Sequence, residues 1–138
     1  MNFIDTNILV YAYDNDEKTK NIIAKQIILD CWENKSGVIS TQVLQEFYVT
    51  VTAKLPKKLS FSEARELIKD FLSWPIEQVT TRDIIDATTL QERYKLSFWD
   101  SLIITLAQKS GAEVLFSEDL QDGQKFGDLT IKNPFNKS

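Results

Sequence analysis

The chain contains no histidine among its 138 residues. This absence removes the commonest general base, and with it the serine and cysteine triads and most zinc sites. Any hydrolytic chemistry of this protein would therefore depend on carboxylates, hydroxyls or lysines.

The chain also has a single cysteine, and no apolar run approaches the roughly 18 residues of a membrane span. Cys31 cannot form an internal disulfide, and it shares a predicted helix face with Ala24, Ile27 and Ile28, so we expect a buried, unreactive thiol. The first residues lack the basic and apolar regions of a secretory signal. We therefore expect a soluble, cytoplasmic protein without a membrane segment.

Length and charge narrow the class of protein. At 138 residues and 43% hydrophobic composition, we expect a single domain over residues 1–138, with a polar tail from about residue 134. The formal net charge of −4 argues against a dedicated duplex-DNA binder, which is usually basic. It is compatible with a nucleic-acid enzyme whose acids surround a metal ion, because bound cations invert the local field.

Short apolar segments alternate with amphipathic ones. Strands are expected at residues 2–4, 38–39, 76–79, 114–116 and 129–132. Helical spacing and capping signals predict helices at residues 16–34, 41–55, 60–73, 81–94 and 97–111, with Thr41 capping the second and Thr80 or Thr81 the fourth. This alternation predicts an α/β fold, a three-layer α/β/α sandwich with a short central parallel sheet of about five strands.

The helix predicted from residue 97 carries an acid on its apolar side. Asp100 shares a face with Ile103, Ile104 and Ala107, which we expect to pack onto the rest of the fold. A carboxylate near a core is costly unless something compensates it. The alternative is a capping box, because Ser97 precedes Asp100 by three residues at a helix start.

Three further acids are expected near the same edge of the sheet. Asp5 ends the first strand and Asp119 follows the strand at residues 114–116, and ligands of such sheets bind beyond the carboxyl ends of the strands. Asp100 lies in a first helical turn, where the helix dipole favours an anion, and Glu46 lies in the second turn of its helix. Four acids from distant parts of the chain can therefore converge on one crevice.

A cluster of carboxylates requires raised pKa values or a bound cation, because like charges a few ångströms apart repel. Ligation by oxygen alone, without histidine or cysteine, selects Mg²⁺ or Mn²⁺. Such a site can generate hydroxide from water and stabilise charge on a phosphodiester during in-line displacement. Thr6, Asn7 and Ser117 are candidates for orienting the carboxylates or a metal-bound water.

Each acid also has a purely structural interpretation, which the residues leave open. Asp5 can cap the turn that follows it, Glu46 can be solvated beside its apolar stripe, and Asp119 can open a turn with Glu118. Asp122 is a further acid that can join the site.

Four short motifs resemble the ordered acidic motifs of the PIN domain family. They are Phe3-Ile4-Asp5-Thr6-Asn7, Gln45-Glu46-Phe47, Phe98-Trp99-Asp100-Ser101 and Leu115-Phe116-Ser117-Glu118-Asp119. The resemblance covers essentially the whole chain, and the order and spacing of the motifs are similar to those of the VapC toxin group of that family.

This resemblance implies a Mg²⁺- or Mn²⁺-dependent ribonuclease, usually a homodimer, that acts as the toxin of a toxin-antitoxin pair. The acidic-site roles, including metal binding, would then fall on Asp5, Glu46, Asp100 and Asp119. A cognate antitoxin would be expected to cover the crevice and to place a basic side chain among the acids.

The fourth acidic role has three candidates in this chain. Glu118, Asp119 and Asp122 all lie in the segment that matches the last motif. Asp119 is preferred, because Ser117 two residues earlier fits the hydroxyl-x-Asp pattern of that region.

Two other functions are compatible with acids on a layered fold. A phosphoacceptor signalling domain would also gather aspartates around Mg²⁺, but it requires an acidic pair near the first strand and a lysine at a late strand end. Here Asp5 is followed by Thr6, and Lys109 falls in a predicted helix. A non-catalytic PIN-like binding module would keep the fold, and the complete acid set argues against it.

The sequence defines the residues that would contact an RNA substrate less well than it defines the candidate acids. Basic groups that can grip its backbone are Lys54, Lys57 and Lys58, or Arg82, Arg93 and Lys95, although scattered surface cations are the commoner interpretation. Trp99 and Tyr13 can stack on a base, but we expect both to be packing residues.

Overall fold

Within residues 1–136, which the computed structural model describes, the chain folds around a six-stranded sheet. The strands are β1 (Asn2–Ile4), β2 (Gly37–Ser40), β3 (Ile76–Glu77), β4 (Val114–Phe116), β5 (Lys125–Phe126) and β6 (Leu129–Lys132). Their order is β3-β2-β1-β4-β6-β5, and every neighbouring pair is parallel except the β5–β6 hairpin. The predicted α/β fold with a mostly parallel sheet is confirmed, and β5 is a strand that the sequence does not predict.

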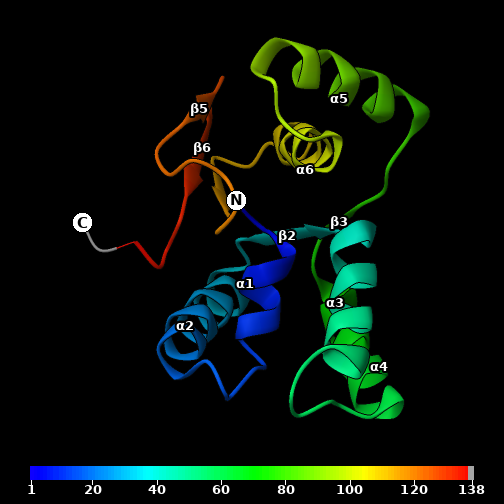
Figure 1. Ribbon diagram of the computed structural model, residues 1–138, viewed down its shortest axis with the longest axis vertical. Helices are drawn as coiled ribbons and strands as arrows, with labels where there is room; N and C mark the ends of the chain where they lie inside the picture. The colour runs from blue at the N-terminus through cyan, green and yellow to red at the C-terminus, as the bar shows by residue number, and fades with distance from the viewer. Residues whose placement is uncertain (137–138) are drawn as a thin grey trace.

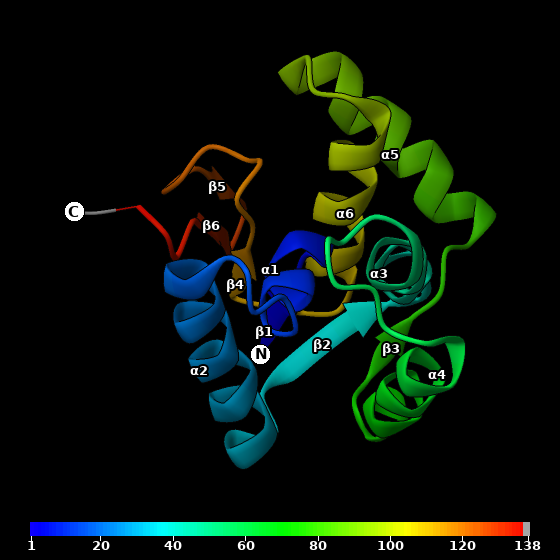
Figure 2. The ribbon, with the colours of Figure 1, turned by 60° about the horizontal axis from the view of Figure 1, so that its bottom comes forward.

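Helices flank this sheet. They are α1 (Thr6–Tyr11), α2 (Lys18–Asn34), α3 (Thr41–Ala53), α4 (Phe61–Asp70), the 3₁₀ turn η1 (Phe71–Ser73), α5 (Thr81–Tyr94) and α6 (Phe98–Lys109). Figures 1 and 2 show α5 and α6 packed as a pair, while α1 contacts both α2 and α3, and α3 contacts α4. Among the helices of residues 1–136, none is long and apolar enough to cross a membrane.

Side-chain caps explain why most helix starts are where the sequence predicts them. Ser60 and Thr80 each begin a complete capping box, and the Ser97 hydroxyl caps α6. The start of α3 differs, because its cap is Ser40, the last residue of β2, and not Thr41. The strand therefore runs directly into the helix without a loop.

The chain order of the strands creates a switch point between β1 and β4. From β1 the chain continues to β2 and β3 on one side, and it then returns to β4 and β6 on the other. In open α/β sheets a crevice forms at such a point, beyond the carboxyl ends of the two central strands. Those ends are followed by Asp5 and Ser117.

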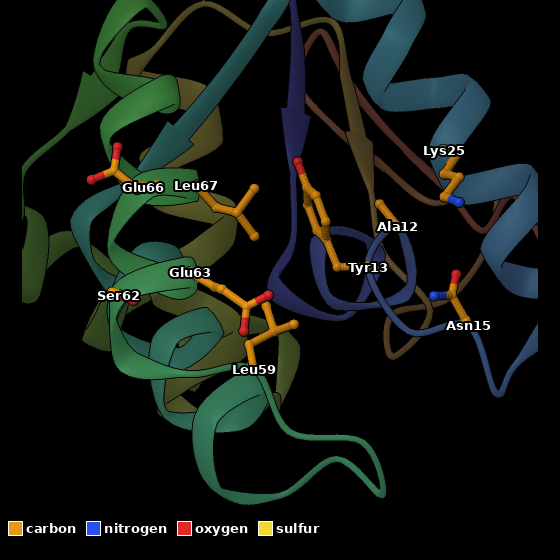
Figure 3. A pocket seen from close by; sticks show the side chains of 9 residues that line it. All are labelled: Ala12, Tyr13, Asn15, Lys25, Leu59, Ser62, Glu63, Glu66 and Leu67. Atoms are coloured by element: carbon orange, nitrogen blue, oxygen red, sulfur yellow. The ribbon is translucent and has the colours of Figure 1, made fainter.

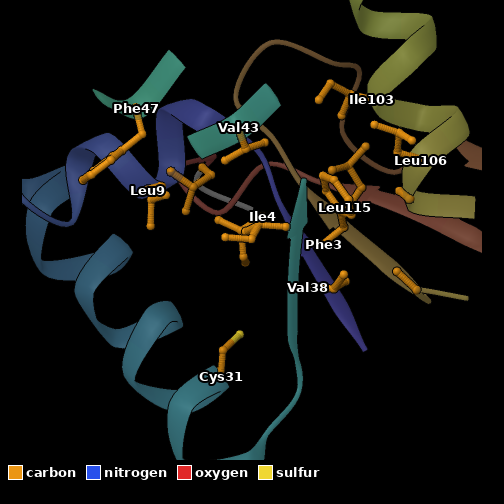
Figure 4. Packing of buried hydrophobic residues seen from close by; sticks show 14 of the residues in the cluster. Phe3, Ile4, Leu9, Cys31, Val38, Val43, Phe47, Ile103, Leu106 and Leu115 are labelled. Carbon is orange, nitrogen blue, oxygen red and sulfur yellow. The ribbon is translucent and has the colours of Figure 1, made fainter. Parts of the chain in front are cut away.

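Buried apolar side chains on both sides of β1 hold the switch point in place. Phe3 and Ile4 of β1 are fully buried, as are Leu115 of β4 and Phe47 of α3 (Figure 4). Cys31 of α2 is buried in the same core, as expected, and burial raises the pKa of its thiol. The polar tail expected from about residue 134 falls partly on residues 137–138, which lie outside the described residues.

Gly37, at the start of β2, lies against the indole of Trp74. A Cβ at Gly37 would stand 2.4 Å from Cζ3 of that ring, which is inside van der Waals contact. The ring has little room to move, because its centroid is 5.3 Å from that of Trp32 and 4.9 Å from that of Phe71. Close approach, and not backbone flexibility, explains the glycine.

We therefore expect Gly37→Ala to lower the free energy of unfolding by about 1–3 kcal/mol, the usual range for overpacking a core. Urea denaturation of the purified protein measures this loss. In a Trp74→Leu background the same substitution should cost much less, because the clash is removed. An equal cost in both backgrounds would contradict the steric explanation.

Candidate active site

Asp5 lies at the switch point, directly beside the residue that follows β4. Pairing of Ile4 with Phe116 aligns the two strand ends, and the Asp5 amide donates to the Phe116 carbonyl at 3.0 Å. The Asp5 carboxylate accepts hydrogen bonds from the Ser117 hydroxyl at 2.8 Å and from the Thr6 amide at 2.7 Å. Asp5 therefore does cap α1, and its half-buried carboxylate also stands at the carboxyl edge of the sheet.

Glu46, on the second turn of α3, is linked to the same edge by α1. Its Oε2 accepts a hydrogen bond of 3.2 Å from the hydroxyl of Thr6. The backbone amide of the same Thr6 donates to Asp5. Oε1 of Glu46 accepts a hydrogen bond of 2.7 Å from the amide of Gln42, one helical turn earlier. Glu46 is exposed, but these two donors orient it, so it is more than a solvated surface acid.

Asp100 lies in the first turn of α6 with a carboxylate that capping does not use. The Ser97 hydroxyl accepts the Asp100 amide at 3.1 Å, but within residues 1–136 the return bond of a capping box is missing. Asp100 is half-buried, and its face partners Ile103 and Ile104 are buried as expected. The capping box proposed from the sequence is therefore only half formed, and the carboxylate is free to act elsewhere.

Asp119, in the loop after β4, is linked by hydrogen bonds to α1 and to Ser117. It accepts a hydrogen bond of 2.8 Å from the side-chain amide of Asn7 on α1, and its own amide donates to the Ser117 hydroxyl at 3.3 Å. Thr6, Asn7 and Ser117, which the sequence suggests as orienting residues, thus each donate to one of the candidate acids.

The two competing acids of this loop have other partners. Glu118 pairs with Lys20 of α2 and accepts a hydrogen bond from the Tyr11 hydroxyl at 2.8 Å. Asp122 accepts the Asn133 amide at 2.9 Å, at the far end of the loop. This arrangement favours Asp119 as the fourth acid.

Burial and nearby charges raise the pKa values of two of the four acids, Asp5 and Asp119. Burial raises the pKa of Asp5 to about 6, and the charges of Asp119 and Glu46 act in the same direction. Burial also raises the pKa of Asp119, as do the charges of Glu118 and Asp100. The structure therefore places Asp119 and Glu46 within electrostatic reach of Asp5, and Asp100 and Glu46 within electrostatic reach of Asp119.

The donor set fits a hard divalent cation. Every candidate ligand is a carboxylate oxygen, and a bound Mg²⁺ or Mn²⁺ would offset both the burial that mainly raises the pKa of Asp5 and the smaller repulsion from Asp119 and Glu46. Within residues 1–136, no three acidic or cysteine side chains approach closely enough to form a ready-made metal site. A cation would therefore have to draw the side chains of the cluster together.

The two aromatic candidates differ from one another. Tyr13 packs edge-on against Phe47 with ring centroids 5.6 Å apart, which confirms the expected packing role. It lines a cavity of about 570 Å³ between the end of α1 and α4, shown in Figure 3, whose lining includes none of the four acids. Trp99 was expected to pack, but it is 62% exposed beside Asp100 and touches the ring of Phe98.

Sequence reasoning did not identify Gln42, Tyr11 or Lys20. Gln42 and Glu46 are four residues apart on one helix, and this spacing is a local signal that could have identified Gln42 as a partner of Glu46. Tyr11 and Lys20 meet Glu118 only through the tertiary fold, about 100 residues away along the chain.

An open, mostly parallel sheet with acids near its switch point is an architecture that several classes of α/β domain share. The chain belongs to the PIN domain family, whose sequence model matches residues 3–122. Comparison with curated protein sequences gave no match.

Solved structures of toxin-antitoxin proteins share this fold. A toxin-antitoxin complex from Klebsiella pneumoniae aligns with a TM-score of 0.69 at 18% identity, over 99% of this chain and 100% of the other. VapC20 of Mycobacterium tuberculosis, described as a sarcin-ricin loop cleaving toxin, aligns with a TM-score of 0.66 at 20% identity, over 86% and 92%. VapBC2 of Rickettsia felis, bound to a promoter DNA fragment, gives 0.66 at 20%, over 96% and 97%. At these identities the likeness shows the fold.

The raised pKa of Asp5 predicts how stability depends on pH in chelator. Between about pH 4 and pH 6 the folded protein holds a proton on Asp5 that the unfolded chain has released, so this group lowers stability as the pH rises. The effect should reach up to about 3 kcal/mol, since each pKa unit corresponds to about 1.4 kcal/mol. Asp5→Asn should remove it, as measured by urea denaturation at a series of pH values.

Asp128→Asn is the matched control, because Asp128 is an exposed acid in the β5–β6 turn. It should leave the pH profile of wild type unchanged. If Asp5→Asn kept the wild-type slope between pH 4 and pH 6, the buried-acid account of Asp5 would be wrong.

Proposed function

We propose that this protein is a Mg²⁺- or Mn²⁺-dependent endoribonuclease that hydrolyses phosphodiester bonds in RNA, and that it is the cytoplasmic toxin of a toxin-antitoxin pair. The observation that carries this proposal is the network of neutral donors on α1 and at Ser117 that links Asp5, Glu46 and Asp119, with Asp100 close enough to act on Asp119 electrostatically. Membership of the PIN domain family supports nuclease activity, and the toxin-antitoxin proteins among the structural neighbours support the biological role.

In this proposal the cation is held by the four acids, which are Asp5, Glu46, Asp100 and Asp119. When bound, a divalent cation of this kind lowers the pKa of a water molecule and stabilises negative charge on a phosphodiester. The chain itself supplies orientation, because neutral donors hold three of these carboxylates: Ser117 and Thr6 hold Asp5, Thr6 and Gln42 hold Glu46, and Asn7 holds Asp119.

The RNA strand is proposed to approach along α3. Lys54 lines a hollow of about 280 Å³ together with Glu46, which places a cation on the same surface as one of the acids. Lys57 and Lys58 lie in the loop that follows α3, whereas Arg82 pairs with Asp86 at 3.3 Å on α5. The exposed indole of Trp99, next to Asp100 in sequence, is available to stack on a base.

The protein partners belong to the same proposal. A complex from K. pneumoniae and VapBC2 of R. felis are toxin-antitoxin assemblies, and by analogy a cognate antitoxin would cover the acids with a basic side chain. A homodimer built from one domain of residues 1–138 is the proposed form of the toxin.

The lysine considered for the phosphoacceptor alternative, Lys109, is not at a strand end, and Lys132, which does end β6, has no acidic pair after β1 to accompany it. Lys109 lies on α6 and pairs with Asp83 of α5 at 2.9 Å and with Glu77 of β3 at 3.7 Å. Its ammonium is therefore paired with acids of α5 and β3, and not with Asp5 at the end of β1.

Asp100→Asn tests the nuclease proposal. We expect the variant to lose RNA cleavage by about 100-fold or more with Mg²⁺, the scale observed when one charge-stabilising group is removed from an active site. Cleavage of total RNA or a defined oligonucleotide by purified protein is the measurement, with Asp128→Asn as a control that keeps activity. Wild-type rates for Asp100→Asn would refute the assignment.

The same variant separates catalysis from helix capping. Because the carboxylate makes no capping bond, Asp100→Asn in chelator should be neutral, or stabilising by about 1 kcal/mol through relief of like-charge repulsion. Thermal unfolding monitored by circular dichroism gives the answer. A large fall in Tm would instead assign Asp100 to capping.

A further inference from the structure

A cluster of one cation, one hydroxyl and one aromatic ring surrounds Glu118, next to the acid site. The Lys20 ammonium of α2 pairs with Glu118 Oε1, and the Tyr11 hydroxyl of α1 donates to Oε2 at 2.8 Å. The ammonium also donates to the Tyr11 oxygen at 3.3 Å. We call Lys20, Tyr11 and Glu118 the latch.

The ring of Phe135, near the carboxyl terminus of the chain, packs against the latch. The Lys20 ammonium lies 4.8 Å from the ring centroid of Tyr11 and 5.4 Å from that of Phe135. The rings of Tyr11 and Phe135 meet edge-on, with centroids 5.3 Å apart. The side chains of Lys20 and Glu118 are 34% and 23% exposed, so this pair is partly shielded from solvent and has more effect than a surface ion pair.

The latch acts on the segment that presents Asp119. Both oxygens of Glu118 are taken up on the α1–α2 side, while the next residue turns its carboxylate to Asn7 and the acid cluster. The Asn133 side chain reaches the Glu118 carbonyl at 3.5 Å, which steadies the same peptide. The carboxylates of Glu118 and Asp119 therefore point to different parts of the fold, the first to Lys20 and Tyr11 and the second to Asn7.

The separation of Glu118 from Asp119 matters because both side chains carry a negative charge. Glu118 and Asp119 are consecutive residues of one loop, and the Lys20 ammonium pairs with the first of these two carboxylates. Without that ammonium, Glu118 would be an additional acid on a short loop, close enough to compete with Asp119 for a hard cation.

We propose that Lys20 and Tyr11 are positioning residues, which hold Glu118 out of the acid cluster so that Asp119 is the acid this loop presents to the metal. The inference rests on the proposed nuclease function and extends it. It assigns a role in metal-site selection to a lysine and a tyrosine that touch neither metal nor substrate.

The test begins with Lys20→Met, which releases Glu118 while keeping an apolar side chain on the rings. We expect kcat for RNA cleavage to fall about 10-fold, the usual effect of removing a group that orients a ligand, with KM for RNA little changed. Mn²⁺ binding without RNA, followed by titration calorimetry, should be as tight as in wild type or tighter, because a carboxylate has been released. Lys25→Met removes an exposed lysine from the same helix, visible in Figure 3, and should behave as wild type.

A double variant distinguishes two roles of the Lys20–Glu118 pair: keeping Glu118 away from the metal, or only stabilising the loop. Replacing Glu118 as well, in Lys20→Met/Glu118→Gln, removes the competing carboxylate, so kcat should recover toward wild type. If kcat stayed low in the double variant, or if Lys20→Met weakened Mn²⁺ binding, the pair would only brace the loop and the proposal would be overturned. A wild-type kcat in Lys20→Met would overturn it as well.

These outcomes are distinct from failure of the proposed function. If wild-type protein neither bound Mn²⁺ nor cleaved RNA, the nuclease assignment itself would fail. If wild type did both and Lys20→Met did not differ from Lys25→Met, only the latch would fail. Circular dichroism melts of each variant, with Lys20→Arg as the charge-conserving comparison, establish that the measured changes come from folded protein.

Discussion

Like charges held at one edge of the sheet are the constraint on which the rest of this structure depends. Parallel pairing of β1 with β4 brings Asp5 beside Ser117, so one hydroxyl donates to the first acid while accepting the amide of Asp119. Packing on both faces of β1 holds this register, because the consecutive residues Phe3 and Ile4 point to opposite faces and both are fully buried. Core packing therefore holds the Asp5 carboxylate in a partly buried position, and this burial is the main cause of its raised pKa, to which the charges of Asp119 and Glu46 add.

The chemistry of the hydrogen-bond donors divides the acids of this region into two kinds. Asp5, Glu46 and Asp119 receive bonds from neutral hydroxyls and amides, which orient a carboxylate without cancelling its charge. Glu118 receives an ammonium, which does cancel it. A site that is to attract a cation needs the first kind of partner, whereas an acid that should stay out of the site needs the second. The partners, more than the positions of the acids in the sequence, distinguish the proposed ligands from their neighbour.

Local signals in the sequence were sufficient for most elements and for the candidate acids, but not for features that depend on distant contacts. Capping residues at Ser60, Thr80 and Ser97 set three helix starts, since a cap is a property of four consecutive residues. The six residues of α1 and the two of β5 are too short to show a period. The latch joins residues 98 positions apart, so nothing near Lys20 in the sequence indicates its partner. The exposure of Trp99 likewise depends on what the fold leaves uncovered.

The motif Asp5-Thr6-Asn7 shows how a weak local pattern can control a whole site. Asp5 caps α1, so the helix begins at the edge of the sheet and its first two residues project in different directions from one turn. Thr6 reaches Glu46 on α3 and Asn7 reaches Asp119 on the loop after β4, while Ile8 and Leu9 are fully buried and fix the helix on the core. One short helix thereby connects three of the four acids, which belong to separate segments of the chain. Any displacement of α1 would misalign all three carboxylates together, so the rigidity of this first turn sets the precision of the site.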